Sequence, residues 1–382
     1  MSNNSDFRSK LKLLDNRSDL DVEKYINEIT SKQSILIWGC IDTYTYGFLK
    51  KFTDINKVRY YGDNDQAKWG TKMNGLLVLS PEEVVEKVKE NSIDHIIITS
   101  MQHLKDIENQ LLSLRIEQDM IDSKGHSIAR SYMINHFFNS HMDDFEKVYS
   151  YLSDERSKAV YLAKLNYKIS LDNQYLADIA SPNEDKYFDK ELLHANENEI
   201  FCDCGSHDGF TLKNFISWTG GKYKKCIAIE ADKDLYSVLN NNVKENGYKN
   251  VQTYNLACWN EKAILKFQSS QTLINKAAAH ITEDGDVYVQ ADALDNILKD
   301  EKVTFLKMDI EGAEEMALKG ARRVIQENNP ILAICIYHKL EDYYTIPLII
   351  KEINPEYELF IRHYTDMDWE TVCYAIPKKH VH

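Results

Sequence analysis

A glycine-containing turn in the second half of the chain has the residue types of a cofactor-binding loop. An apolar run that begins at Ile200 ends in Asp203, and Gly205 and Gly209 follow before a helical pattern starts. Glycine lets the backbone turn sharply and approach a ligand closely, and the start of a helix presents free N–H groups. We therefore expect Asp203, Gly205, Ser206 and Gly209 to bind a cofactor.

An acidic residue, Glu230, ends the next predicted strand, 21 positions after Gly209. A carboxylate at this place can accept hydrogen bonds from the hydroxyls of a ribose. A dinucleotide-binding loop reads G-x-G-x-x-G, whereas this loop reads D-x-G-x-x-x-G. The leading carboxylate of Asp203 repels a pyrophosphate but attracts the cationic amino and sulfonium groups of S-adenosylmethionine. The charge therefore favours S-adenosylmethionine as the cofactor.

Three further residues at strand ends have the types needed for proton transfer. Asp309 ends the fourth predicted strand of this half, Glu311 follows it, and His338 ends the fifth. Methyl transfer to a hydroxyl requires two atoms to be positioned and one proton to be removed. Because histidine accepts a proton most readily near neutral pH, we expect His338 to be the general base. Asp309 is expected to contact the cofactor and to orient the base or the acceptor, with Glu311 beside them.

The same three side chains allow a second interpretation. Carboxylate oxygens and an imidazole nitrogen can bind a divalent metal ion, which lowers the pKa of a bound hydroxyl. We keep a metal held by Asp309, Glu311 and His338 as an alternative that we do not favour.

Other polar and small residues have weaker assignments. Ala257 and Cys258 close the third predicted strand of this half and line either an adenine pocket or the core. Glu314 is expected to be a solvated helix residue, and Asp295 an N-cap. Arg362 is expected to form a surface salt bridge.

The elements that must position these residues alternate between strands and helices. Strands are predicted at Glu199–Asp203, Cys226–Glu230, Val251–Leu256, Thr304–Asp309, Ile331–Tyr337, Glu358–Ile361 and Val372–Ile376. Helices are predicted at about Thr211–Ser217, Lys233–Asn246, Ala313–Glu327 and Ile346–Ile353. Seven strands with helices between them indicate a doubly wound α/β sheet, whose ligands bind at the carboxyl ends of the strands.

The first part of the chain has the same alternation on a smaller scale. An apolar run at Ser34–Gly39 and strands at Lys57–Tyr61 and His95–Thr99 predict a Rossmann-like α/β domain over residues 1–122. Its glycine loop departs from G-x-G-x-x-G, because Ile41 stands in place of the second glycine. Apolar residues at helical spacing predict a helical connector over residues 123–185.

Composition excludes several classes of protein. The formal net charge of the 382 residues is −14, which argues against a nucleic-acid partner. The longest apolar run is too short for a membrane span, and an apolar signal segment is missing from the start of the sequence. Seven cysteines without C-x-x-C pairs indicate free thiols in a reducing compartment, so we expect a cytoplasmic protein.

With its motifs taken together, the region from Tyr187 to Lys378 resembles the FkbM family of methyltransferases. The motifs that carry the resemblance are YFD at Tyr187–Asp189, FCDCGSHDGFTL at Phe201–Leu212, IEAD at Ile229–Asp232, LDNIL at Leu294–Leu298, KMDIEGAEEMALKGA at Lys307–Ala321, NPILAICIYHK at Asn329–Lys339, FIRHY at Phe360–Tyr364 and ETVCYAIP at Glu370–Pro377. The sequence departs modestly from the family pattern, because Cys202 and Cys204 lie on either side of the motif aspartate, Asp203.

The resemblance implies a class I methyltransferase fold over residues 186–382, with a mostly parallel seven-stranded sheet and an antiparallel last strand. It further implies S-adenosylmethionine as the methyl donor and a hydroxyl of a sugar, polysaccharide or glycoconjugate precursor as the acceptor. Two alternatives stay open: a catalytically silent scaffold with this fold, and a nucleotide-binding oxidoreductase that uses the N-terminal domain.

The N-terminal domain looks like small Rossmann-type domains that are often joined to sugar-modifying enzymes. The features it shares with them are the D-N-D strand end at Asp63–Asp65, Trp69-Gly70 and the segment Asn74–Glu82. A structural or dimerising role is expected ahead of nucleotide-sugar binding, because its isolated glycines are a weak signal.

Overall fold

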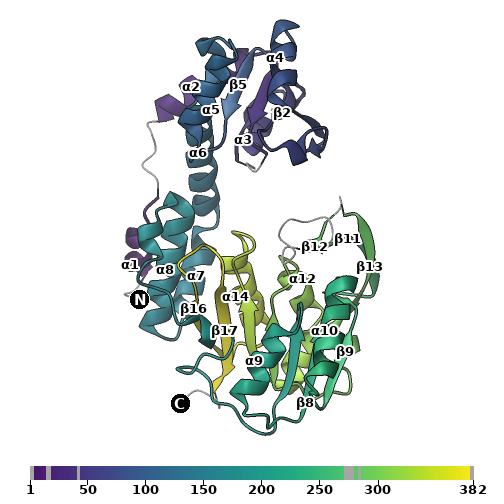
Figure 1. Cartoon of the computed structure of the whole chain (residues 1–382). Coiled ribbons are helices and arrows are strands. Elements are labelled where there is room, and N and C mark those ends of the chain that lie inside the picture. Colours follow the sequence, from purple (N-terminus) through teal and green to yellow (C-terminus); the bar gives the residue numbers. More distant parts are fainter. Residues whose placement is uncertain (1–3, 14–18, 41–43, 271–278, 283–284, 379–382) are drawn as a thin grey trace. The chain divides into compact units, whose positions relative to one another are not determined.

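The computed structural model describes residues 4–13, 19–40, 44–270, 279–282 and 285–378 (Figure 1); Ile41 lies outside this part. Two compact units are present: one is Leu13–His141, and the other combines Met1–Lys12 with Met142–His382. The stretch expected to be a connector divides between them. Its helix α6 (Gly125–Ser140) belongs to the first unit, and α7 (Met142–Tyr151) and α8 (Glu155–Ser170) belong to the second.

The unit Leu13–His141 contains a six-stranded sheet in the order β3-β4-β2-β1-β5-β6, in which only the β3–β4 pair is antiparallel. Its strands are β1 (Ile35–Trp38), β2 (Val58–Gly62), β3 (Lys72–Met73), β4 (Leu76–Leu79), β5 (His95–Ile98) and β6 (Ile121–Asp122). Its other helices are α2 (Asp19–Ser31), α3 (Tyr44–Phe52), α4 (Pro81–Lys89) and α5 (Leu104–Ser113). The expected α/β domain is confirmed.

Strands β1 and β5 of this sheet are covered on both faces, which explains their continuous apolar runs. Ile37 and Ile97 pack in a cluster with residues of α3 and α6. The neighbouring residues Trp38 and Ile98 point to the other face and pack in a cluster with residues of α4 and α5.

The larger unit contains a seven-stranded sheet in the order β16-β17-β15-β14-β7-β8-β9, with β17 antiparallel to both of its neighbours. The strands are β7 (Ile200–Cys204), β8 (Lys225–Ile229), β9 (Val251–Tyr254), β14 (Phe305–Met308), β15 (Ile331–Cys335), β16 (Tyr357–His363) and β17 (Thr371–Pro377). Each lies at a predicted strand. The mostly parallel sheet with an antiparallel last strand is confirmed.

Helices surround this sheet in Figure 1. They are α1 (Asn4–Lys10), α7, α8, α9 (Phe210–Trp218), α10 (Lys233–Glu245), α11 (Leu294–Ile297), α12 (Glu314–Lys319), α13 (Arg322–Asn328) and α14 (Asp342–Ile353). An aromatic cluster packs under α9, where the Phe201 and Phe215 rings stack with centroids 4.4 Å apart. Among the described residues, no helix is both long enough and apolar enough to cross a membrane.

A separate four-stranded sheet, which the sequence did not predict, lies between β9 and β14 in the chain. Its strands are β10 (Ala257–Trp259), β11 (Ala263–Gln268), β12 (His280–Ile281) and β13 (Val287–Ala293), in the order β10-β13-β11-β12. Figure 1 shows β11 and β13 as a pair set apart from the main sheet. Ala257 and Cys258 therefore begin a new strand instead of closing the third strand, as we had expected.

Two local expectations were wrong. The Arg362 side chain is 2% exposed and pairs with Asp154 at 2.7 Å, so it does not form a surface salt bridge. Asp295 does not cap its own helix, because its carboxylate accepts hydrogen bonds from the N–H groups of Arg323 and Val324 at the start of α13. In each case the partner is far away in the sequence: Asp154 for Arg362, and the start of α13 for Asp295.

Candidate active site

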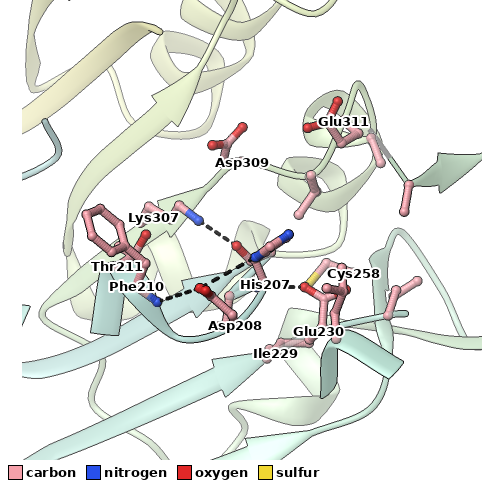
Figure 2. A pocket seen from close by; sticks show the side chains of 18 of the residues that line it. His207, Asp208, Phe210, Thr211, Ile229, Glu230, Cys258, Lys307, Asp309 and Glu311 are labelled. Atoms are coloured by element: carbon pink, nitrogen blue, oxygen red, sulfur yellow. Dashed lines mark hydrogen bonds and ion pairs between the residues drawn. The ribbon is translucent and has the colours of Figure 1, made fainter. Parts of the chain in front are cut away.

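A cavity of about 340 Å³ opens at the carboxyl ends of β7, β8 and β14, where a doubly wound sheet places its ligands. The glycine turn after β7 forms one part of its wall, and Glu230 after β8 forms another. Asp309 and Glu311, which follow β14, lie on the side opposite Glu230 in Figure 2. The volume lies within the range of small-molecule sites, about 300–1,000 Å³.

The glycine turn is held so closely that its first glycine has no room for a side chain. Gly205 has φ +77°, and a Cβ built on it would lie 1.9 Å from the carbonyl oxygen of Asp309. The N–H groups of Gly205 and Ser206 both donate to the Ile229 carbonyl oxygen at 3.0 Å. Gly205 and Ser206 line the cavity. Gly209, with φ +91°, begins α9 and is not among the described residues that line it.

Asp203 lies beneath the turn and has no surface on the cavity. Its side chain is fully buried, and its Oδ1 is 2.9 Å from the Nζ of Lys307. Burial raises the pKa of Asp203, although the ammonium of Lys307 opposes that rise. Because Lys307 balances its charge, Asp203 is not a free anion that faces a ligand, as our argument for S-adenosylmethionine had assumed. Sequence reasoning missed Lys307, although a lysine within the apolar run FLKMDI signals a buried partner.

Glu230 has the geometry expected of a ribose-binding residue. Its Oε2 accepts a hydrogen bond from the His207 N–H and its Oε1 one from the Asp232 N–H, both at 2.8 Å (Figure 2 shows Glu230 beside His207). Burial raises the pKa of the carboxyl group. Each carboxylate oxygen has a second lone-pair site, so both can still accept a hydroxyl hydrogen.

An apolar wall continues the cavity beyond Glu230. Ala257 and Cys258 line it as we expected, although from β10. Phe267 of β11 and Ile281 of β12 also line it, and sequence reasoning missed both. Such a wall suits a flat aromatic ring such as adenine.

Asp309 lies in a set of hydrogen-bond donors at the other end of the cavity. It accepts hydrogen bonds from the hydroxyls of Tyr187 at 2.6 Å and Tyr337 at 3.1 Å. Burial alone raises its pKa, but the hydrogen bond from His338 and the charge of Lys307 outweigh burial and hold the pKa well below its usual range. Asp309 is therefore an anion and an acceptor at neutral pH.

His338 does not fit the role of general base. Its Nδ1 is 3.1 Å from Glu314, and its Nε2 is 3.3 Å from Asp309 and 3.7 Å from Glu311. Burial lowers its pKa, but the bonds to Asp309 and Glu314 outweigh burial and raise the pKa to about 11. A histidine with that pKa is already protonated at neutral pH and cannot accept another proton. The structure therefore makes His338 a buried cation and opposes our first assignment.

Glu311 is better placed to accept a proton. It lines the cavity, and its side chain is 30% exposed. Burial raises its pKa to about 7, with the charge of His338 opposing and that of Asp309 adding to the rise. Its backbone is left-handed, with φ 53°.

Several non-glycine residues that line this cavity have a left-handed backbone conformation. Tyr187, His207, Glu311 and Glu370 have φ of 67°, 51°, 53° and 69°, and all four line it. Such conformations cost of order 1–3 kcal/mol each and concentrate at functional sites. Glu370 also pairs with Lys186, which reaches the cavity from the segment before β7.

The set of residues in the alternative metal site changes one member. Ligand atoms of Asp309, Glu314 and His338 lie within 4.8 Å of one another, so Glu314 takes the place we gave to Glu311. Glu314 is fully buried and accepts a hydrogen bond from the Ile310 N–H, which corrects its expected solvated position. The protonated His338 already balances charge in this cluster, which is the role that a metal ion has in the alternative interpretation.

The corresponding acidic position in the N-terminal unit has protein partners. Asp63 accepts hydrogen bonds from the Cys40 N–H at 3.0 Å and the Asp65 N–H at 2.9 Å, and it pairs with Lys68 at 3.0 Å. Oδ2 of Asp63 accepts from both Cys40 and Lys68, so Lys68 competes with a ribose for this oxygen, whereas each oxygen of Glu230 has one protein donor.

Comparison with known proteins gives two family matches. Residues 203–365 match the methyltransferase FkbM domain, and residues 31–121 match the C2185-like, N-terminal family. No curated protein matches the sequence.

Solved structures similar to the chain include methyltransferase FkbM from Methylobacillus flagellatus KT, with 21% identity, 93% of each chain covered and a TM-score of 0.56. A precorrin-6y C5,15-methyltransferase from Geobacter metallireducens GS-15 has 9% identity, with 51% of this chain and 86% of that chain covered and a TM-score of 0.33. A SAM-dependent methyltransferase from Aquifex aeolicus has 17% identity, 53% and 97% coverage and a TM-score of 0.30.

Proposed function

Because the chain is an S-adenosylmethionine-dependent methyltransferase whose residues 203–365 belong to the FkbM family, we propose that it methylates a hydroxyl oxygen of a saccharide or glycoconjugate precursor. The observation that carries this proposal is one cavity with a glycine turn and a ribose-type carboxylate, Glu230, on one side and an acidic, hydroxyl-rich end on the other.

The cofactor half of the cavity fits the donor. The turn at Gly205 and Ser206, which lines the cavity, suits the methionine part, and Glu230 suits the ribose. Ala257, Cys258 and Phe267 would enclose the adenine. When bound, S-adenosylmethionine supplies an electrophilic methyl group on a positively charged sulfur.

The acceptor half supports a hydroxyl-rich substrate. Asp309, Glu311 and Glu370 offer acceptors, and Lys186 offers donors, at the same end of the cavity. A site that donates and accepts hydrogen bonds at several points suits a sugar, with its many hydroxyls, better than it suits an apolar acceptor. Asp309, ionised and held by two tyrosines, would orient the reacting hydroxyl.

Glu311 would remove the proton from that hydroxyl. It lies on the cavity wall beside Asp309, and the cationic His338 behind both residues helps to keep Asp309 ionised. An oxygen that loses its proton as it attacks becomes a stronger nucleophile, so a positioned base accelerates the transfer.

Calorimetry with S-adenosylhomocysteine, NAD and nucleotide sugars tests the cofactor. Binding of S-adenosylhomocysteine supports the proposal, whereas tight NAD binding without it favours the oxidoreductase alternative. Transfer of labelled methyl into a saccharide fraction of the host, lost in Glu311→Gln, then tests catalysis. Binding without any transfer would favour a silent scaffold, and loss of transfer in EDTA would favour the metal alternative.

A further inference from the structure

Lys307 is the one buried cation beneath the cofactor turn among the described residues, and the reaction as proposed above gives it no part. It lies on β14, its side chain is 2% exposed, and it reaches the floor of the cavity. Its Nζ donates to the carbonyl oxygens of Gly205 at 2.7 Å and Cys204 at 3.3 Å and pairs with Asp203 at 2.9 Å.

These contacts direct the ammonium group toward the turn. A lysine has three N–H donors and no acceptor. Two of these donors go to carbonyl oxygens of the turn, and the ammonium group also forms an ion pair with Asp203. Most of the hydrogen-bonding capacity of Lys307 is therefore used within the protein, although its side chain lines the cavity.

The carbonyl groups that Lys307 holds belong to the most restricted part of the turn. Gly205 is pressed against the carbonyl oxygen of Asp309, and its N–H is fixed by Ile229. The contact from Lys307 fixes the remaining polar group of this residue. The Gly205–Ser206 peptide is thus held from β8 on one side and from β14 on the other.

We propose that Lys307 is a positioning residue for the cofactor turn: with Asp203 as its counter-ion, it fixes the Cys204 and Gly205 carbonyls and thereby sets the affinity for the amino-acid part of the cofactor. The proposal rests on the proposed function. It predicts that the loss of Lys307 weakens contacts to the methionine part and leaves those to the nucleoside part, which Glu230 binds.

Two commercially available ligands separate these parts. S-adenosylhomocysteine reaches both the turn and Glu230, whereas adenosine lacks the amino-acid part. Calorimetry on Lys307→Met should show S-adenosylhomocysteine bound about 10-fold or more weakly. This is the effect expected when the turn, no longer held by Lys307, loses one hydrogen bond to the charged amino-acid part of the ligand. The affinity for adenosine should change by less than about 2-fold, because Glu230 and the apolar wall are untouched.

Lys164→Met is the matched control. Lys164 is equally buried and also pairs with an aspartate, Asp368, at 3.2 Å, but it does not line the cavity. Its loss should lower stability while the affinities for both ligands stay at the wild-type values.

Removal of one member of a buried pair can prevent folding. The double variant Asp203→Asn/Lys307→Met leaves no unpaired charge and provides a second test, with circular dichroism and a melting curve to show that it is folded. A folded variant that binds S-adenosylhomocysteine like wild type, or that loses both ligands equally, would overturn the proposal. Wild-type protein that binds no S-adenosylhomocysteine would instead contradict the proposed function.

Discussion

At the scale of single residues, the surroundings of His338 behind the cavity determine which side chain there carries a proton. His338 lies among Asp309, Glu311 and Glu314, and their negative charges keep it protonated. The sequence correctly placed it beside Asp309 and Glu311 but did not indicate its charge. The charge depends on Glu314, whose burial only the packing of α12 determines, because a glutamate early in a helix is usually solvated.

The pH dependence of methyl transfer should follow Glu311. Its pKa is raised to about 7 and only the ionised form accepts a proton, so the rate should rise with pH through about 7 and level off above it. Glu311→Gln should lower the rate by about 10²–10⁴-fold. Initial rates with labelled donor across pH measure both effects. A rate that falls as pH rises would contradict this role.

His338→Gln tests the cation role directly. The charge of His338 lowers the pKa of Glu311, so its removal should move the midpoint of the pH–rate profile upward by about 1 unit or more. A general base at His338 would instead make the pH dependence disappear along with the activity. The two outcomes are distinguished in the same rate measurement.

Glu230→Gln should weaken binding of S-adenosylhomocysteine by about 10-fold or more, because hydrogen bonds to a charged group contribute about 1.5–3 kcal/mol. Glutamine keeps the shape but has only one acceptor oxygen, so one of the two backbone N–H groups loses its partner and the melting temperature should fall modestly. Glu261→Gln, in the turn between β10 and β11, serves as the control for calorimetry. Unchanged affinity in Glu230→Gln would remove the ribose assignment.

At the scale of elements, strands that form long apolar runs could be predicted, whereas the short or mixed strands of the separate four-stranded sheet could not. Residues Ile331–Cys335 form one apolar run, which indicates a central strand. In β11, Ile264 is 72% exposed while Phe267 is buried, and β10 and β12 have only three and two residues. Runs so short and mixed carry little periodic signal. Phe267 and Ile281, which line the cavity from β11 and β12, were therefore missed.

The strand–turn–helix element allows a sharp test of close packing. Gly205→Ala adds a Cβ 1.9 Å from the Asp309 carbonyl oxygen, whereas Gly221→Ala, at a similar φ of +75°, meets nothing within 4 Å. Gly221→Ala should cost only the left-handed penalty, about 1–2 kcal/mol. Gly205→Ala should cost more in a denaturant titration and should abolish S-adenosylhomocysteine binding. Equal effects of the two substitutions would show that the turn is not tightly packed.

Helix α8 is fastened to the sheet through Arg362. Loss of this buried partner of Asp154 should lower the free energy of unfolding by about 3–5 kcal/mol in Arg362→Met. Arg322→Met removes an exposed pair with Glu352 and should cost about 0–1 kcal/mol. Thermal melts of both variants provide the comparison. A similar loss in both would mean that the buried pair contributes no more than a surface pair.

At the scale of the whole molecule, the unit that contains the methyltransferase fold is larger than the region from Tyr187 to Lys378 that resembles the FkbM family. Tyr161 of α8 donates to the Tyr343 carbonyl oxygen, and Lys164 pairs with Asp368. Residues 1–12 joined by a short linker to residues 142–382 keep the whole unit and should therefore fold and bind S-adenosylhomocysteine, whereas residues 186–382 should aggregate. Size-exclusion chromatography and calorimetry measure both properties. A soluble, binding-competent 186–382 fragment would show that α7 and α8 are dispensable.

The position of β17 has a consequence for how the protein is made. This strand is the last in the described sequence, yet it pairs with β15 on one side and β16 on the other, and Glu370 of the cavity wall directly precedes it. A ribosome adds these residues after the other six strands of this sheet, so the growing chain holds a gap between β15 and β16 until β17 has been made. Nascent protein should thus acquire its ligand only after β17 has been made, and a premature stop before Thr371 leaves β15 without its partner strand on that side.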